Sequence, residues 1–170
     1  DFPVEQYWRD NRLNMIHEGT HGIQAADLLG RKVVMQGGAG LQLLGRTIGA
    51  TIAQARKHPE LAAWADQLAQ ALQDVGEATQ AAWATGNPTE ALANAVPYMQ
   101  AFGHTVLAWV WLDVACSVLA RDATLSIAAS AGRMGAARYF YHYELPRIGA
   151  WLQVVRQRDL TCAALDEDAF

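Results

Sequence analysis

Cysteine is nearly absent from this sequence. The chain has 170 residues and only two cysteines, Cys116 and Cys162. Two thiols are too few for the disulfide framework that supports small secreted domains. Disulfides are therefore excluded as the main source of stability. We expect a chain that works in the reducing cytoplasm.

Charge is also scarce, and it is never concentrated in one place. Lys and Arg number 13 against 17 Asp and Glu, the net charge is −4, and no basic run occurs. A nucleic-acid surface needs clustered Lys and Arg, so that class of partner is disfavoured. The longest apolar run, from Thr105 to Ala120, is interrupted by Asp113 and is short for a membrane span. We expect a buried helix there instead.

Strand-like alternation does not occur over any useful length, and no heptad repeat is sustained. Hydrophobic residues make up 52% of the chain and charged residues 18%, which is enough to build a large core. Apolar residues instead recur with helical periodicity, which predicts an all-α helical bundle. The predicted helices cover Val4 to Asn14, Thr20 to Val33, Leu41 to Lys57, Leu61 to Ala84, Thr89 to Leu119 with a kink at Pro97, and a final long pattern that Pro146 kinks or divides.

Capping residues mark where several of these helices begin. Thr20 is a good N-cap for the second helix, and Asn87 is a good N-cap followed by Pro88 at the first helical position. Asp122 or Thr124 is expected to cap the final pattern.

Glycine and alanine mark breaks and thin surfaces along the chain. The break at 37–40 is the expected domain boundary, which separates residues 1–38 from residues 39–170. Gly45 and Gly49 are expected to allow close helix packing, as is the small-residue stretch 128–136. The chain begins Asp1-Phe2-Pro3, without Met or a signal-like segment, so we expect a piece of a longer protein.

One stretch, His17 to Gln24, combines unusual chemistry with unusual backbone residues. His17, Glu18 and His21 match the H-E-x-x-H pattern, in which two histidines hold zinc and the Glu acts as a base. Gly19 and Gly22 weaken the continuous helix that this pattern needs. The sequence also offers no third ligand at the expected spacing. A zinc peptidase is therefore the less favoured alternative.

The same stretch carries a second, longer pattern. Residues 7–24 read Y-W-R-D-N-R-L-N-M-I-H-E-G-T-H-G-I-Q, and residues 25–33 read A-A-D-L-L-G-R-K-V. They resemble the late signature of the acyl-CoA dehydrogenase family, "Y-x-R-D-x-R" followed by "I-Y-E-G-T-N-G-I-Q" and "A-x-D-L-x-G-R-K". G-A-A-R-Y-F at 135–140 and E-L-P-R at 144–147 resemble the extra C-terminal helical domain of the 3-methylmercaptopropionyl-CoA dehydrogenase-like subgroup.

The resemblance implies a fold and a reaction. Residues 1–38 would end the family's C-terminal helical bundle, and residues 39–170 would form an added domain of four to five helices. Family members use FAD to oxidise an acyl-CoA to a 2-enoyl-CoA, pass electrons to an electron-transfer flavoprotein or similar acceptor, and form homo-oligomers. We expect this piece alone to bind no FAD and to be inactive.

The resemblance also assigns roles to individual residues. Glu18 matches the base that removes the α-proton, and Gly19 a position against the thioester. Thr20, His21 and Gly22 match positions that contact FAD. His17 and His21 depart from the family, which usually has Tyr and Asn or Ser at these positions.

Residues 39–170 also fit a non-catalytic role. Beyond Gly40 the sequence shows no convergent acid, base and nucleophile, so this part is alternatively an oligomerisation or lid domain. His104 is expected to be a hydrogen-bonding residue at the edge of the core rather than a ligand. The aromatic stretch 138–143 is expected to pack against the bundle.

Overall fold

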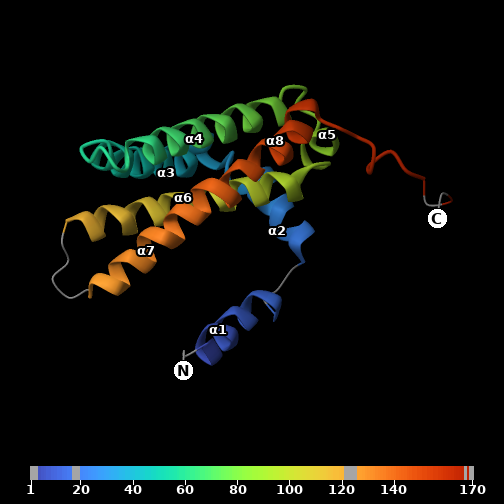
Figure 1. Cartoon of the computed structure of the whole chain (residues 1–170). Helices are drawn as coiled ribbons and strands as arrows, with labels where there is room; N and C mark the ends of the chain where they lie inside the picture. Colours follow the sequence, from blue (N-terminus) through green and yellow to red (C-terminus); the bar gives the residue numbers. More distant parts are fainter. Residues whose placement is uncertain (1–3, 17–19, 121–125, 167, 169–170) are drawn as a thin grey trace.

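The computed structural model describes residues 4–16, 20–120, 126–166 and 168. The described residues form helices and turns and contain no strand, so the predicted all-α bundle is confirmed (Figure 1). The α-helices are α1 Val4–Ile16, α2 His21–Asp27, α3 Met35–Ala55, α4 Ala62–Ala82, α5 Pro88–Leu92, α6 Ala95–Leu119, α7 Ile127–Tyr139 and α8 Ile148–Gln157. A π-helical turn, η1 (Leu28–Lys32), continues α2, while a π-helical turn, η2 (Phe140–Glu144), and a 3₁₀ turn, η3 (Leu145–Arg147), connect α7 to α8.

Helix α6 lies at the centre of the bundle. It packs against α2, α3, α4, α7 and α8, as expected for the most hydrophobic helix of the chain. Its inner face contributes Tyr98 and Leu112, both fully buried. The Tyr98 hydroxyl lies 2.7 Å from Thr79 Oγ1 on α4, and Trp109 Nε1 donates to Thr51 Oγ1 on α3 over 2.9 Å. The polar ends of the large aromatic side chains therefore find partners inside the bundle.

Helix α4 follows its predicted amphipathic pattern closely. Leu61, just before the helix, and Leu68 are fully buried, and Trp64 is 7% exposed. The Trp64 ring stacks on that of Tyr141, with 5.2 Å between centroids. Exposed Gln and Glu side chains occupy the opposite face.

The predicted long helix over residues 89–119 is wrong in one respect. The chain breaks at Ala93–Asn94 to form α5 and α6, and Pro97 lies in the first turn of α6 instead of kinking a helix interior. Proline is tolerated there because first-turn N–H groups have no partner within the helix. The predicted cap at Asn87 is confirmed, since its Oδ1 accepts from Thr89 N over 3.0 Å.

The final pattern begins later than expected. Ser126 is the N-cap of α7 and accepts from Ala129 N over 3.1 Å, whereas Asp122 and Thr124 lie outside the described residues. Pro146 divides this pattern as predicted, because regular helix gives way to η2 and η3 before α8. The apolar stripe Leu145, Ile148, Leu152 and Val155 continues across the interruption and is buried throughout.

Glycine behaves as expected at the break but not inside the helices. Gln36, Gly37 and Gly38 all have positive φ and interrupt the regular part of α3. A Cβ added at Gly45 or Gly49 would meet nothing within 4 Å, and the same holds for Gly132 and Gly135. The prediction that these four positions admit a neighbouring backbone is therefore wrong.

The N-terminal helices differ in how they meet the bundle. Ala25 of α2 and Leu29 of η1 are fully buried, and Trp83 Nε1 donates to the Leu29 carbonyl over 3.2 Å. Helix α1 lies apart from the bundle, and each of its side chains from Val4 to Asn14 is exposed (Figure 1). The domain boundary between residues 38 and 39 stays a prediction.

Candidate functional site

The candidate site lies around the start of α2. His17 and two predicted site residues, Glu18 and Gly19, lie outside the described residues. The other three, Thr20, His21 and Gly22, form the entry to α2 and are all exposed. The structure therefore describes only the three residues that are predicted to contact the cofactor, and they are consecutive in the chain.

Thr20 occupies the N-cap position that the sequence predicts. Its backbone is extended (φ −79°, ψ 169°), and its carbonyl accepts from Gln24 N over 3.0 Å. Its side chain, however, makes no capping hydrogen bond. The predicted N-cap position is therefore confirmed, but the side-chain hydrogen bond that a capping Thr usually accepts is not formed. The hydroxyl is thus not committed to holding the helix.

The first turn of α2 faces outward next to Thr20. His21 is exposed, and Gly22 has ordinary helical backbone, where an added Cβ would come no nearer than 3.9 Å to Thr20 Oγ1. The first N–H groups of a helix lack partners within the helix and favour an anionic group. Further along, Arg31 donates to Asp27, and this hydrogen bond lowers the pKa of the Asp27 carboxyl.

A second polar group forms where α6 meets the turn before α8. Glu144 accepts from Tyr139 Oη over 3.0 Å, lies 3.4 Å from the Arg147 guanidinium, and lies 3.7 Å from His104 Nε2. The hydrogen bond to Glu144 raises the pKa of the Tyr139 phenol. His104 Nδ1 donates to the Gln100 carbonyl over 2.9 Å, as expected for a residue at the core edge. Each of these groups is already partnered, which favours a structural role.

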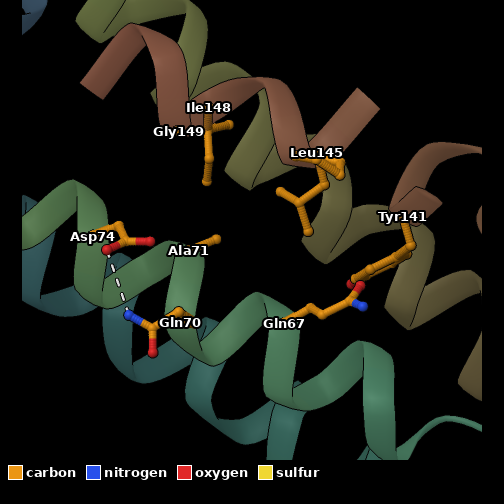
Figure 2. A pocket seen from close by; sticks show the side chains of 9 residues that line it. Gln67, Gln70, Ala71, Asp74, Tyr141, Leu145, Ile148 and Gly149 are labelled. Atoms are coloured by element: carbon orange, nitrogen blue, oxygen red, sulfur yellow. Dashed lines mark hydrogen bonds between the residues drawn. The ribbon is translucent and has the colours of Figure 1, made fainter. Parts of the chain in front are cut away.

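Sequence reasoning missed a hollow between α4 and the segment from η2 to α8. It has a volume of about 320 Å³. Figure 2 shows Gln67, Gln70 and Asp74 on α4 opposite Leu145, Ile148 and Gly149. Asp74 is held by Arg156 at 2.7 Å and by Gln70 at 3.4 Å. The hollow offers no uncommitted acid beside a nucleophile, so we assign it no chemistry.

Metal ligands do not gather in the part of the chain that the structure describes. Among those residues, no group of three or more His, Cys, Asp and Glu side chains could hold a metal ion. One described helix, Ala95–Leu119, is long and apolar enough to cross a membrane by length and composition, with a mean hydropathy of 1.5 over its most apolar window. A core helix passes the same test, so this is weak evidence for a span.

Comparison with known families gives the chain its class. A family model described as acetyl-CoA dehydrogenase C-terminal like matches residues 44–166, which is most of the chain. The chain belongs to this family. The match covers α4 to α8 and most of α3, so the resemblance noted at residues 135–147 is confirmed at the family level.

Two curated relatives agree with this family. The chain is 36% identical, over 129 residues, to 3-methylmercaptopropionyl-CoA dehydrogenase of Ruegeria pomeroyi. This alignment covers 72% of this chain and 21% of that protein. It is 29% identical, over 192 aligned positions, to the broad-specificity linear acyl-CoA dehydrogenase FadE5 of Mycobacterium tuberculosis. This second alignment covers 100% of this chain and 30% of that protein. The chain thus spans less than a third of the length of either relative.

Proposed function

We propose that this chain is the C-terminal part of a FAD-dependent acyl-CoA dehydrogenase that oxidises an acyl-CoA to a 2-enoyl-CoA. The observation that carries the proposal is the family match over residues 44–166, preceded by the dehydrogenase-like run at residues 7–33. One relative is named as a 3-methylmercaptopropionyl-CoA dehydrogenase and the other as a linear acyl-CoA dehydrogenase. The proposal includes a cytoplasmic homo-oligomer that passes electrons to an electron-transfer flavoprotein or similar acceptor.

Glu18 is the base in this proposal. Its carboxylate would take the α-proton of the acyl thioester, and bound FAD would supply the acceptor for the β-hydride, so that a carbon–carbon double bond could form. An α-proton is weakly acidic, so the base must be aligned and desolvated while the thioester oxygen is polarised. Gly19, with no side chain, would lie against the thioester. Burial beside the substrate would raise the pKa of Glu18 in the assembled enzyme.

The described residues fit an FAD contact at the start of α2. Thr20 makes no capping bond, and His21 and Gly22 are exposed, so hydroxyl and backbone N–H groups are open to a neighbour. In the proposal these three residues bind and orient the cofactor, whose chemistry when bound is to accept the hydride. His21 replaces the family's usual Asn or Ser, so its contact would be made through an imidazole nitrogen or through its backbone.

The decisive experiment uses the full-length protein. Its visible spectrum is recorded, and a panel of acyl-CoAs is then added anaerobically to the wild type and to Glu18→Gln. Bleaching of the flavin in the wild type and its loss in Glu18→Gln would support both the reaction and the base, and the panel would identify the acyl chain. A colourless protein that carries one equivalent of zinc would reject the proposal and favour the His17-Glu18-x-x-His21 peptidase.

A second role for residues 39–170 has its own support. Within the described part of this region no acid, base and nucleophile converge, and the polar groups that do meet are already paired. This region therefore also fits an oligomerisation or lid domain of the same flavoprotein.

A further inference from the structure

The outer face of α6 exposes apolar side chains along its middle, with exposed Gln100 on one side and exposed Asp113 and Ser117 on the other. Leu107 and Val110 are 48% and 46% exposed, and Gly103 and Val114 continue their stripe with spacings of four and three residues. Only 28% of the most apolar window of the helix is buried. The predicted buried helix is thus buried on one side only. A helix face of this kind normally packs against something.

A second uncovered apolar surface lies on α1. Val4, Tyr7 and Trp8 are 66%, 74% and 65% exposed, and they lie on one stripe of the helix. The chain then runs from α1 into α2, which packs against α6. The polypeptide that precedes α2 therefore approaches the bundle at the helix whose outer face is uncovered.

We propose that the stripe of Leu107, Val110 and Val114 is the docking surface for the flavoprotein body, the part of the polypeptide that precedes residue 1. This inference rests on the proposed function. The relatives supply a body of sufficient size, because the matched region is only 21% and 30% of their lengths. A body that covers α1 would lie where the chain enters the bundle through α2, and α2 packs against α6. Leu107, Val110 and Val114 are uncharged, which suits burial against protein, and the exposed Asp113 carboxylate beside them disfavours a polyanion.

Thiol accessibility in the full-length protein tests whether the stripe is covered. Val110→Cys is compared with Ile127→Cys, each with Cys162→Ser, and maleimide labelling of each site is followed by peptide mass spectrometry. Cys116 is buried, and burial, followed by the nearby Asp113 carboxylate, raises the pKa of its thiol, so it reacts slowly. Ile127 is 91% exposed against 46% for Val110, so exposure alone explains only about a twofold difference.

We expect Val110→Cys to react at least about tenfold more slowly than Ile127→Cys. Equal rates would overturn the inference. A photo-cross-linker at position 110, in a mixture of ¹⁵N-labelled and unlabelled protein, identifies the cover. Cross-links to peptides before residue 1 within one isotopic copy are expected. Links between copies, or flotation of the protein with phosphatidylcholine vesicles, would assign the surface to a second copy or to a membrane and reject the docking.

Charge substitution separates docking from chemistry. In the full-length protein, Val110→Asp should speed proteolytic cleavage near 37–40 by about tenfold, while Ile127→Asp should not. Both variants should keep the flavin spectrum and its bleaching by acyl-CoA. Unchanged cleavage with normal bleaching would reject the docking alone. A colourless wild type would reject the proposed function, whatever the labelling rates show.

Discussion

The bundle and the N-terminal helix use the same kinds of residue in opposite ways. In the bundle, Leu68, Tyr98 and Leu112 are fully buried, and the polar groups near them have partners. In α1, Tyr7 and Trp8 are 74% and 65% exposed. As far as the structure describes it, the bundle thus holds a core and no convergent chemistry, whereas the predicted site residues follow in the sequence a helix without a core of its own.

The largest expected effect concerns chemistry alone. Glu18→Gln in the full-length enzyme should lower the rate of flavin reduction by acyl-CoA by about 10²- to 10⁴-fold, because the amide cannot accept the α-proton. The rate is measured by anaerobic stopped flow. The midpoint of thermal unfolding should change little, since Gln has nearly the same size and shape as Glu. A full rate in Glu18→Gln would remove Glu18 as the base.

A core substitution should show the opposite pattern. Leu68→Ala, at a fully buried position of α4, should lower the free energy of unfolding of the 170-residue chain by about 2–5 kcal/mol. The matched control is Leu13→Ala on α1, where the side chain is 64% exposed and the change should stay within about 0.5 kcal/mol. Urea titration measures both. Similar losses at the two positions would mean that α1 is packed in solution.

Alkaline pH should weaken the bundle through its buried tyrosines. Burial raises the pKa of Tyr98 to about 12, although its hydrogen bond with Thr79 lowers it in part. The phenol therefore keeps its proton in the folded chain at pH values where the unfolded chain, with a pKa near 10, loses it. Stability from this group is complete below pH 10 and is lost as pH rises toward 12, by about 1.4 kcal/mol per pH unit.

Tyr98→Phe tests this directly. Thr79 Oγ1 still donates to the Val75 carbonyl over 2.8 Å, so the variant leaves no bare hydroxyl behind. Burial also raises the pKa of Tyr141, so part of the pH dependence should remain in the variant. Urea titrations between pH 9 and pH 12 should show a shallower decline for Tyr98→Phe. An unchanged slope would mean that Tyr98 is not protected from deprotonation in the folded chain.

The sequence predicted the structure correctly where the pattern involved neighbouring residues and a single apolar face. The stripe of α4 and the cap at Asn87 each depend on residues within a few positions of each other. It failed at Pro97, because proline suits both a kink and a first turn, and sequence alone does not choose between them. It also failed on the outer face of α6. A helix that is apolar on all sides has no periodicity to show which side is left uncovered.

The candidate site divides along similar lines. A specific run of residues, not the spacing of charges, led to the prediction of Glu18 as the base, and that residue lies outside the described part of the chain. Thr20 was placed correctly at the N-cap, but the missing capping bond depends on side-chain orientation, which sequence does not reveal. The hollow beside Gln67 was missed because α4 and α8 lie far apart in sequence and meet only in the fold.

The smallest expected effects compare two N-caps, one at α5 within the bundle and one at the start of α2 beside the predicted site. Asn87→Ala removes the bond to Thr89 N and should lower the free energy of unfolding by about 1 kcal/mol. Thr20→Ala should change it by only a few tenths of a kcal/mol, because Thr20 makes no capping bond. If the Thr20 hydroxyl binds FAD, the same substitution should instead weaken flavin retention by the full-length protein during dilution. Equal losses of stability at both caps, with flavin retention unchanged, would make Thr20 a structural residue and remove the hydroxyl from the proposed cofactor contact.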